Sequence, residues 1–217
     1  MRYNGKGRAA RKVKSIDRED TGMLVFAELL LFVAAALTYL RCFKTEEGWD
    51  AKVGLGALRY FTLLSNLFSA FTALATAIAL LRGPVPFPLW LCRCVSVASV
   101  TVTLLTVLFF LGPALGYKSQ LTGVNLFFHL LLPLLAIVLF CFFERFYPLS
   151  LPQSLLGITP VTVYGLVYLY KVVYASPEKR WEDFYGFNKS GKWQIAFVAM
   201  HLGAAIVCLL LWLLCRL

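Results

Sequence analysis

Six long apolar runs divide the chain, and the short segments between them hold most of the charged residues. The runs cover about residues 22–41, 58–81, 90–112, 122–143, 155–174 and 193–215. A helix of about 20 residues crosses the roughly 30 Å hydrocarbon layer of a membrane. Barrel strands would instead alternate apolar and polar residues. The pattern therefore predicts an all-α, polytopic membrane protein that forms a single bundle of six transmembrane helices.

Composition supports this interpretation. The 217 residues are 60% hydrophobic and only 15% charged, with a mean hydropathy of +0.75. Soluble domains are nearer half apolar and about a quarter charged, so a soluble globular class is excluded. We expect an integral, multi-pass membrane protein whose surroundings are membrane lipids.

Positive charge is concentrated at the N-terminus, where the first 20 residues carry seven Lys and Arg. A basic segment next to a first span favours the cytoplasmic side, and six crossings return the C-terminus to that side. We therefore predict a basic cytoplasmic arm over residues 1–21 and a transmembrane domain over 22–217. The net charge of +10 would favour contact with anionic lipid headgroups. The sequence contains no basic folded domain, so we do not expect it to bind nucleic acid.

The second run carries a polar stripe. Arg59, Thr62 and Asn66 follow one another at three and four residues, which places them on one helix face, with Ser65 beside them. Small hydroxyl residues at such spacing often only let helices pack closely. A carboxamide in hydrocarbon needs a partner, so Asn66 is expected to bond to a neighbouring helix.

The fourth run offers that partner. Asn125, His129 and Pro133 lie four residues apart on one face. Histidine takes up and returns a proton near neutral pH. Proline removes the hydrogen bond to the carbonyl four residues earlier, here that of His129, and kinks the helix. This pattern favours a cavity beside the imidazole, although a purely structural histidine is the alternative.

Depth along the spans places Thr62, His129 and His201 in the same leaflet, so they can converge on one pocket. A hydroxyl becomes an effective nucleophile when an adjacent base takes its proton. Thr62 and His129 are therefore the candidate catalytic pair. His201 is a second proton carrier or a structural residue.

Five further residues, Arg59, Ser65, Asn66, Asn125 and Tyr164, are candidates for binding or support. Asn66 or Asn125 would orient the imidazole or donate to an oxyanion. Arg59 would hold a carboxylate or phosphate near the interface, and Tyr164 would face the pocket. The loop 175–192, rich in aromatic residues, is expected to rest over the outer mouth of the bundle.

The six cysteines indicate no cofactor. Cys92 and Cys94 are separated by one residue, and no Cys or His pair completes a zinc site. We predict neither a metal nor a cofactor.

The segments "RYFTLLSN" and "NLFFHLLLP" resemble the androgen-induced-gene family of six-helix intramembrane hydrolases and their prokaryotic relatives. The resemblance is carried by Tyr60 to Thr62 and His129 to Pro133. It implies a threonine nucleophile at Thr62, a base at His129 and a fatty-acid ester substrate. The chain has "DFYGFN" where the family often has a Tyr-Pro-Tyr-like element, which changes the expected substrate mouth.

The leading hypothesis is an intramembrane hydrolase of lipid esters, and an acyl transferase would use the same dyad. A non-enzymatic lipid-binding or small-molecule transport protein is the alternative from another class. A third is a structural bundle in which Asn66 pairs with Asn125.

Overall fold

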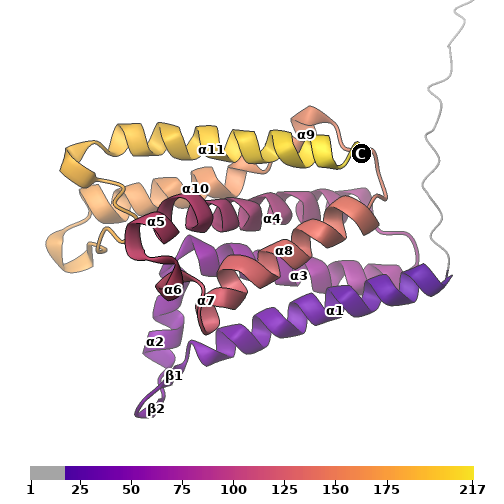
Figure 1. Cartoon of the computed structure of the whole chain (residues 1–217), viewed down its shortest axis with the longest axis horizontal. Coiled ribbons are helices and arrows are strands. Elements are labelled where there is room, and N and C mark those ends of the chain that lie inside the picture. The colour runs from indigo at the N-terminus through magenta and orange to yellow at the C-terminus, as the bar shows by residue number, and fades with distance from the viewer. Residues whose placement is uncertain (1–17) are drawn as a thin grey trace, which may run out of the picture.

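Six helical spans make up the protein in the computed structural model, which describes residues 18–217 (Figure 1). Each span is long and apolar enough to cross a membrane. They are Glu19–Arg41, Phe61–Arg82, Phe87–Leu115, Val124–Phe143, Leu151–Tyr174 and Trp193–Leu214. The predicted all-α class and six-helix membrane bundle are confirmed.

Three spans are single helices: α1 (Arg18–Arg41), α3 (Phe61–Arg82) and α11 (Trp193–Leu214). The others contain π-helical turns, in which an N–H bonds to the carbonyl five residues back. The third span joins α4 (Phe87–Thr106), the π-turn η2 (Val107–Leu111) and α5 (Gly112–Leu115). The fourth joins α7 (Val124–Leu126), η3 (Phe127–Leu131), α8 (Leu132–Val138) and η4 (Leu139–Phe143). The fifth joins α9 (Leu151–Leu155), α10 (Ile158–Leu169) and η5 (Tyr170–Tyr174).

The helix α4 is at the centre of the bundle. It packs against α3, α8, α10 and α11, while α1 lies along the far side of α3 (Figure 1). Alanine, serine and threonine dominate the buried positions of α3, and such small residues let helix backbones approach closely. The start of α1 and the end of α11 lie at the same end of the bundle (Figure 1).

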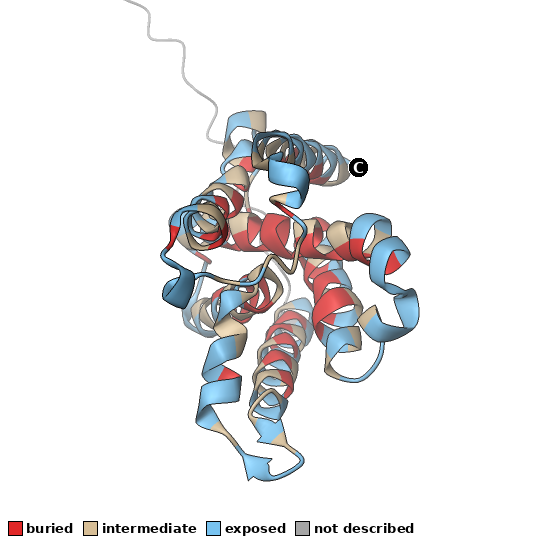
Figure 2. Ribbon diagram, turned by 90° about the vertical axis from the view of Figure 1, so that its left-hand side faces the viewer, coloured by how far each residue is buried: buried red, intermediate tan, exposed pale blue. Residues whose placement is uncertain are grey.

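The surface is apolar and much of the interior is polar. Phe26, Phe71 and Phe109 are exposed, whereas Asn66, Arg93 and many Ser and Thr residues are buried. Figure 2 shows the exposed residues around the outside of the bundle and the buried ones along its inner helix faces. This distribution suits a protein whose outer surface contacts lipid.

The boundaries depart from the sequence prediction in particular places. The second span begins at Phe61, not residue 58, because Tyr60 is extended and the short helices α2 (Ala51–Gly56) and η1 (Ala57–Arg59) precede it. Arg59 therefore lies outside the helix that carries Thr62. Two-residue strands, β1 (Lys44–Thr45) and β2 (Gly48–Trp49), form a small hairpin. Most of the predicted basic arm 1–21 lies outside the described residues.

Candidate functional site

The N-terminus of α3 is capped by a side chain from a distant loop. No side-chain cap comes from Tyr60, the residue that precedes the helix, and the first N–H groups of a helix need partners from elsewhere. The N–H of Phe61 donates to the Tyr185 hydroxyl over 3.1 Å. That hydroxyl is also within hydrogen-bonding reach of the Thr62 backbone and side chain.

Asp183 gives the loop that carries Tyr185 its shape. Its carboxylate accepts hydrogen bonds from the N–H groups of Phe187 and Asn188, each 2.8 Å long, and from the Tyr168 hydroxyl at 3.0 Å. The Tyr168 hydroxyl in turn accepts from the N–H of Tyr185. The loop 175–192 is thus tied to α10 through Tyr168.

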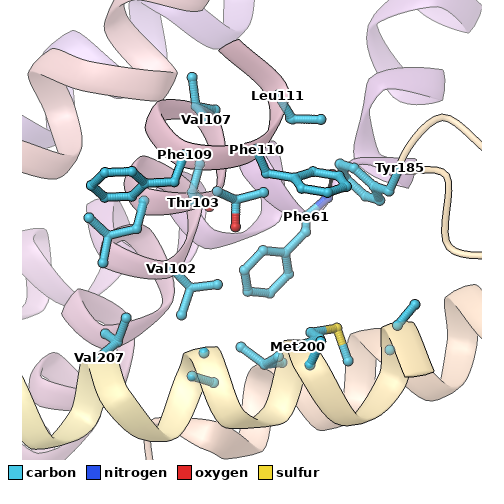
Figure 3. Close-up of a pocket in the computed structure, with 18 of the residues that line it drawn as sticks. Phe61, Val102, Thr103, Val107, Phe109, Phe110, Leu111, Tyr185, Met200 and Val207 are labelled. Atoms are coloured by element: carbon cyan, nitrogen blue, oxygen red, sulfur yellow. Dashed lines mark hydrogen bonds between the residues drawn. The ribbon is translucent and has the colours of Figure 1, made fainter. Parts of the chain in front are cut away.

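A large apolar cavity begins at Thr62. Its volume is about 640 Å³, within the roughly 300–1,000 Å³ range of small-molecule sites. Side chains from η2, α10 and α11 form its walls, and Tyr185 closes one end (Figure 3). Phe109, Phe110 and Ile206 line it and are also exposed, so the cavity reaches the outer apolar surface.

Hydroxyl side chains from Thr62, Thr103, Thr106 and three tyrosines supply the polar part of the cavity lining. The Tyr164 hydroxyl donates to the Arg59 carbonyl over 2.7 Å and lies beside the Tyr185 hydroxyl. Burial raises the pKa of Tyr185, and this outweighs the opposing effect of the hydrogen bonds from Phe61 and Thr62. Tyr185 therefore remains a neutral hydroxyl at physiological pH, able to donate its proton.

Asn66 links α3 to the fourth span, as the sequence predicted. Its amide nitrogen donates to the Thr62 carbonyl at 2.7 Å and to the Phe128 carbonyl at 2.9 Å. A primary amide has two N–H groups, and both are used. Asn66 is therefore a support that holds the Thr62 and Phe128 backbones together, and it has no proton left for an oxyanion.

The π-turn explains why Phe128 is the partner. The N–H of Leu132 bonds to the Phe127 carbonyl, five residues back. In this register the next donor would be residue 133, but Pro133 has no N–H. The carbonyl that Pro133 leaves without a donor in this register is that of Phe128. Asn66 donates a hydrogen bond to this carbonyl.

His129 follows Phe128 in the chain, and its side chain is buried. One of its ring nitrogens has a hydrogen-bond partner. Its Nδ1 lies 2.7 Å from the Gln120 carbonyl. A carbonyl only accepts, so Nδ1 carries the proton and Nε2 keeps the lone pair of a neutral imidazole. Among the described residues no hydrogen bond joins the ring to the Thr62 hydroxyl, and His129 is not one of the residues that line the cavity.

The other candidates lie apart from the cavity wall or at its edge. Ser65 bonds to the Thr103 hydroxyl at 2.9 Å and to the Thr62 carbonyl. Asn125 donates to the Ser119 carbonyl, away from Asn66. Arg59 is exposed and its guanidinium lies over Tyr60 and Phe184.

Thr62 lines the cavity, but neither His129 nor His201 does. The Nε2 of His201 lies 2.9 Å from the Thr162 hydroxyl on α10, and its Nδ1 lies 2.8 Å from the carbonyl of Phe197 on its own helix. The expectation that three residues converge is wrong in this respect, because equal depth places side chains at one level but not on facing sides of the helices.

Sequence reasoning missed a charged cluster at the other end of the bundle. Glu28, Arg93 and Glu144 are each 0% exposed, and Arg93 lies between the two carboxylates. In the sequence these three residues are single charges of opposite sign that stand within an apolar run or directly after one. Within residues 18–217, no group of three or more His, Cys, Asp or Glu is arranged to hold a metal.

Replacing Asn66 with leucine is expected to lower the free energy of unfolding by about 1 kcal/mol, because interhelical polar contacts in membranes contribute about that much. Unfolding in mixed detergent micelles would measure the change. The matched control is Asn125→Leu, which removes an exposed amide that spans no helix interface. An equal loss in both variants would contradict the bridging role of Asn66.

A scan against protein-family models gave no match, and neither the curated proteins nor the solved structures gave one.

Proposed function

We propose that this protein is an intramembrane hydrolase of long-chain lipid esters in which Thr62 is the nucleophile and His129 the base. The observation that carries the proposal is the apolar cavity of about 640 Å³, which Thr62 helps to line. Such a site would hold an acyl chain among apolar side chains and present the ester group to Thr62. The resemblance of "RYFTLLSN" and "NLFFHLLLP" to intramembrane hydrolases supports the same two residues.

The chemistry needs a base, and the tautomer of His129 suits it. As the Thr62 oxygen bonds to the ester carbonyl carbon, its proton would pass to Nε2 of His129, directly or through one water. The ester C–O bond then breaks, and the leaving alcohol takes that proton. Water would repeat the sequence at the acyl-threonine and release the fatty acid. With another alcohol in place of that water, the same steps would make the protein an acyl transferase.

Three neighbouring groups would support these steps. Asn66 bonds to the Thr62 and Phe128 carbonyls through one amide nitrogen, and His129 follows Phe128, so this bridge would tie together the helix turns that carry the nucleophile and the base. The Tyr185 hydroxyl would donate to the oxyanion that forms at the ester carbonyl. Arg59, exposed beside Tyr60 and Phe184, would hold a carboxylate or phosphate at the water interface.

A second function is favoured by one observation. Because His129 is not among the described residues that line the cavity, the cavity would also suit a protein that binds or moves lipid without cleaving it.

In either case we place both termini in the cytoplasm, following the basic N-terminal segment. The cavity then opens into the outer leaflet.

A fluorophosphonate probe separates the two functions, because it reacts with activated hydroxyl groups. The purified protein is expected to be labelled, and Thr62→Ala and His129→Ala are each expected to abolish labelling. Thr122→Ala removes an exposed threonine and His201→Ala removes the histidine bonded to Thr162, so both should label normally. Folded protein that does not label, or labels equally in all variants, would favour lipid binding without catalysis.

A further inference from the structure

The Glu28–Arg93–Glu144 cluster joins three parts of the chain that are far apart in sequence. Glu28 lies on α1, Arg93 on α4 and Glu144 directly after η4. Arg93 Nη2 lies 3.2 Å from Glu28 Oε2, and Arg93 Nε lies 3.1 Å from Glu144 Oε2. All three side chains are completely buried.

Arg93 has all its nitrogens engaged. Nε donates to both carboxylate oxygens of Glu144, Nη1 donates to the hydroxyl and carbonyl of Ser69, and Nη2 donates to Glu28 Oε1. The Nε–H is shared between the two Glu144 oxygens, at 3.2 and 3.1 Å. The hydrogen bond from Nη2 to Glu28 Oε1 is longer, at 3.5 Å, and the 3.2 Å contact from Nη2 to Glu28 Oε2 is not a hydrogen bond of good geometry.

The charges of this cluster do not balance. Two ionised carboxylates around one guanidinium leave one negative charge with no exposure to water, and an uncompensated buried charge is strongly unfavourable. Glu28 Oε2 makes no hydrogen bond of good geometry to any described residue. The Glu144 carboxylate is within hydrogen-bonding reach of the Glu28 carboxyl group. A proton on Glu28 would remove the excess charge and supply the missing hydrogen bond.

We infer that this cluster is a proton-binding site that holds one proton, shared by Glu28 and Glu144 and located mainly on Glu28. In that state Arg93 and Glu144 form the ion pair, and Glu28 is a neutral acid that donates to Glu144. The inference is independent of the proposed hydrolase, because the cluster shares no residue with the Thr62 cavity.

The groups around the cluster do not supply the positive charge that would balance the second carboxylate. Cys94 on α4, Cys141 on η4 and Cys215 after α11 are the nearest thiols, and their ionisation would only add negative charge. Arg145 carries a positive charge, but it donates to the Cys141 carbonyl and forms no ion pair with Glu28 or Glu144 in the described part of the chain. From α3 the facing group is Ser69, which does not titrate. Trp90 donates to the Glu144 carbonyl.

Infrared spectroscopy of the full-length protein in lipid tests the inference, because a protonated carboxylic acid has a C=O stretch that carboxylates lack. We expect this band at neutral pH, shifted to lower frequency in heavy water. Glu28→Gln, which mimics the neutral acid, should remove the band and leave the protein folded. Glu47→Gln, at an exposed loop position, should leave the band unchanged.

A second variant tests whether the proton is shared. In Glu144→Gln, Glu28 becomes the remaining carboxylate for Arg93, so it should release its proton and the band should disappear. A wild-type protein without the band, or a band that persists in Glu28→Gln, overturns the inference. Persistence in folded Glu144→Gln overturns the sharing of one proton by the pair.

Discussion

Phenylalanine in place of Gly203 is expected to lower the turnover of long-chain esters about a hundredfold and to spare short-chain ones. Gly203 lines the cavity on α11, and a Cβ added there meets nothing within 4 Å. The added Cβ would meet no neighbouring atom, and we expect the ring to occupy part of the cavity in place of the acyl chain. Losing the burial of about four methylenes costs about 3 kcal/mol, or about a hundredfold in kcat/KM. Hydrolysis rates over a series of ester chain lengths measure this.

The control is Gly22→Phe, where the same change adds a ring in open space at the exposed start of α1. It should leave every chain length unaffected. If Gly203→Phe lowered the rates for short and long esters equally, the change would have harmed the fold or the chemistry. Unchanged turnover of long esters would contradict the assignment of this cavity to the acyl chain.

Arg93→Met is expected to destabilise the bundle more than any change at the Thr62 end. It leaves two carboxyl groups buried without their guanidinium, and breaking a buried ion pair in this way costs about 3–5 kcal/mol. Unfolding in mixed detergent micelles measures the loss. Adding Glu28→Gln and Glu144→Gln to Arg93→Met should restore much of the stability, because the triple variant has no buried charge.

Arg82→Met is the matched control, since Arg82 is exposed at the end of α3. We expect almost no change in its free energy of unfolding. Failure of the triple variant to recover stability would mean that Arg93 acts through packing or through Ser69, not through the two carboxyl groups.

The hydrophobic pattern was sufficient to predict the spans, because a run of apolar residues long enough to cross a bilayer has few alternatives to a helix. The ends were less predictable. The second span begins after an extended Tyr60, and nothing in the apolar run around residue 58 indicates that break. The fifth begins at Leu151, where a Ser150–Gln153 capping box starts α9 within a polar stretch.

The candidate site was predictable only in part. An unpaired amide in hydrocarbon is costly, so the sequence predicted that Asn66 would bond to the fourth span. It did not predict that the partner would be the Phe128 carbonyl. That partner depends on a π-turn, which moves the carbonyl deprived of a donor by Pro133 from residue 129 to residue 128. Tyr185 was missed because it is 123 positions beyond Thr62 in a loop, and only the folded chain brings the two together.

The Glu28–Arg93–Glu144 cluster was missed for a related reason. Each residue is unremarkable alone, since a charge near the end of a span can reach the headgroups by extending its side chain. Only the packing of α1, α4 and the end of η4 brings these three side chains into contact with one another and away from water.

The position of Phe109, Phe110 and Ile206 on the rim of the cavity has a kinetic consequence. An ester that enters there arrives by two-dimensional diffusion within one leaflet and never crosses the aqueous phase. Its rate would follow the mole fraction of ester in the bilayer, so diluting the substrate with inert phospholipid should slow the reaction. Diluting whole vesicles with buffer should leave the turnover per protein unchanged.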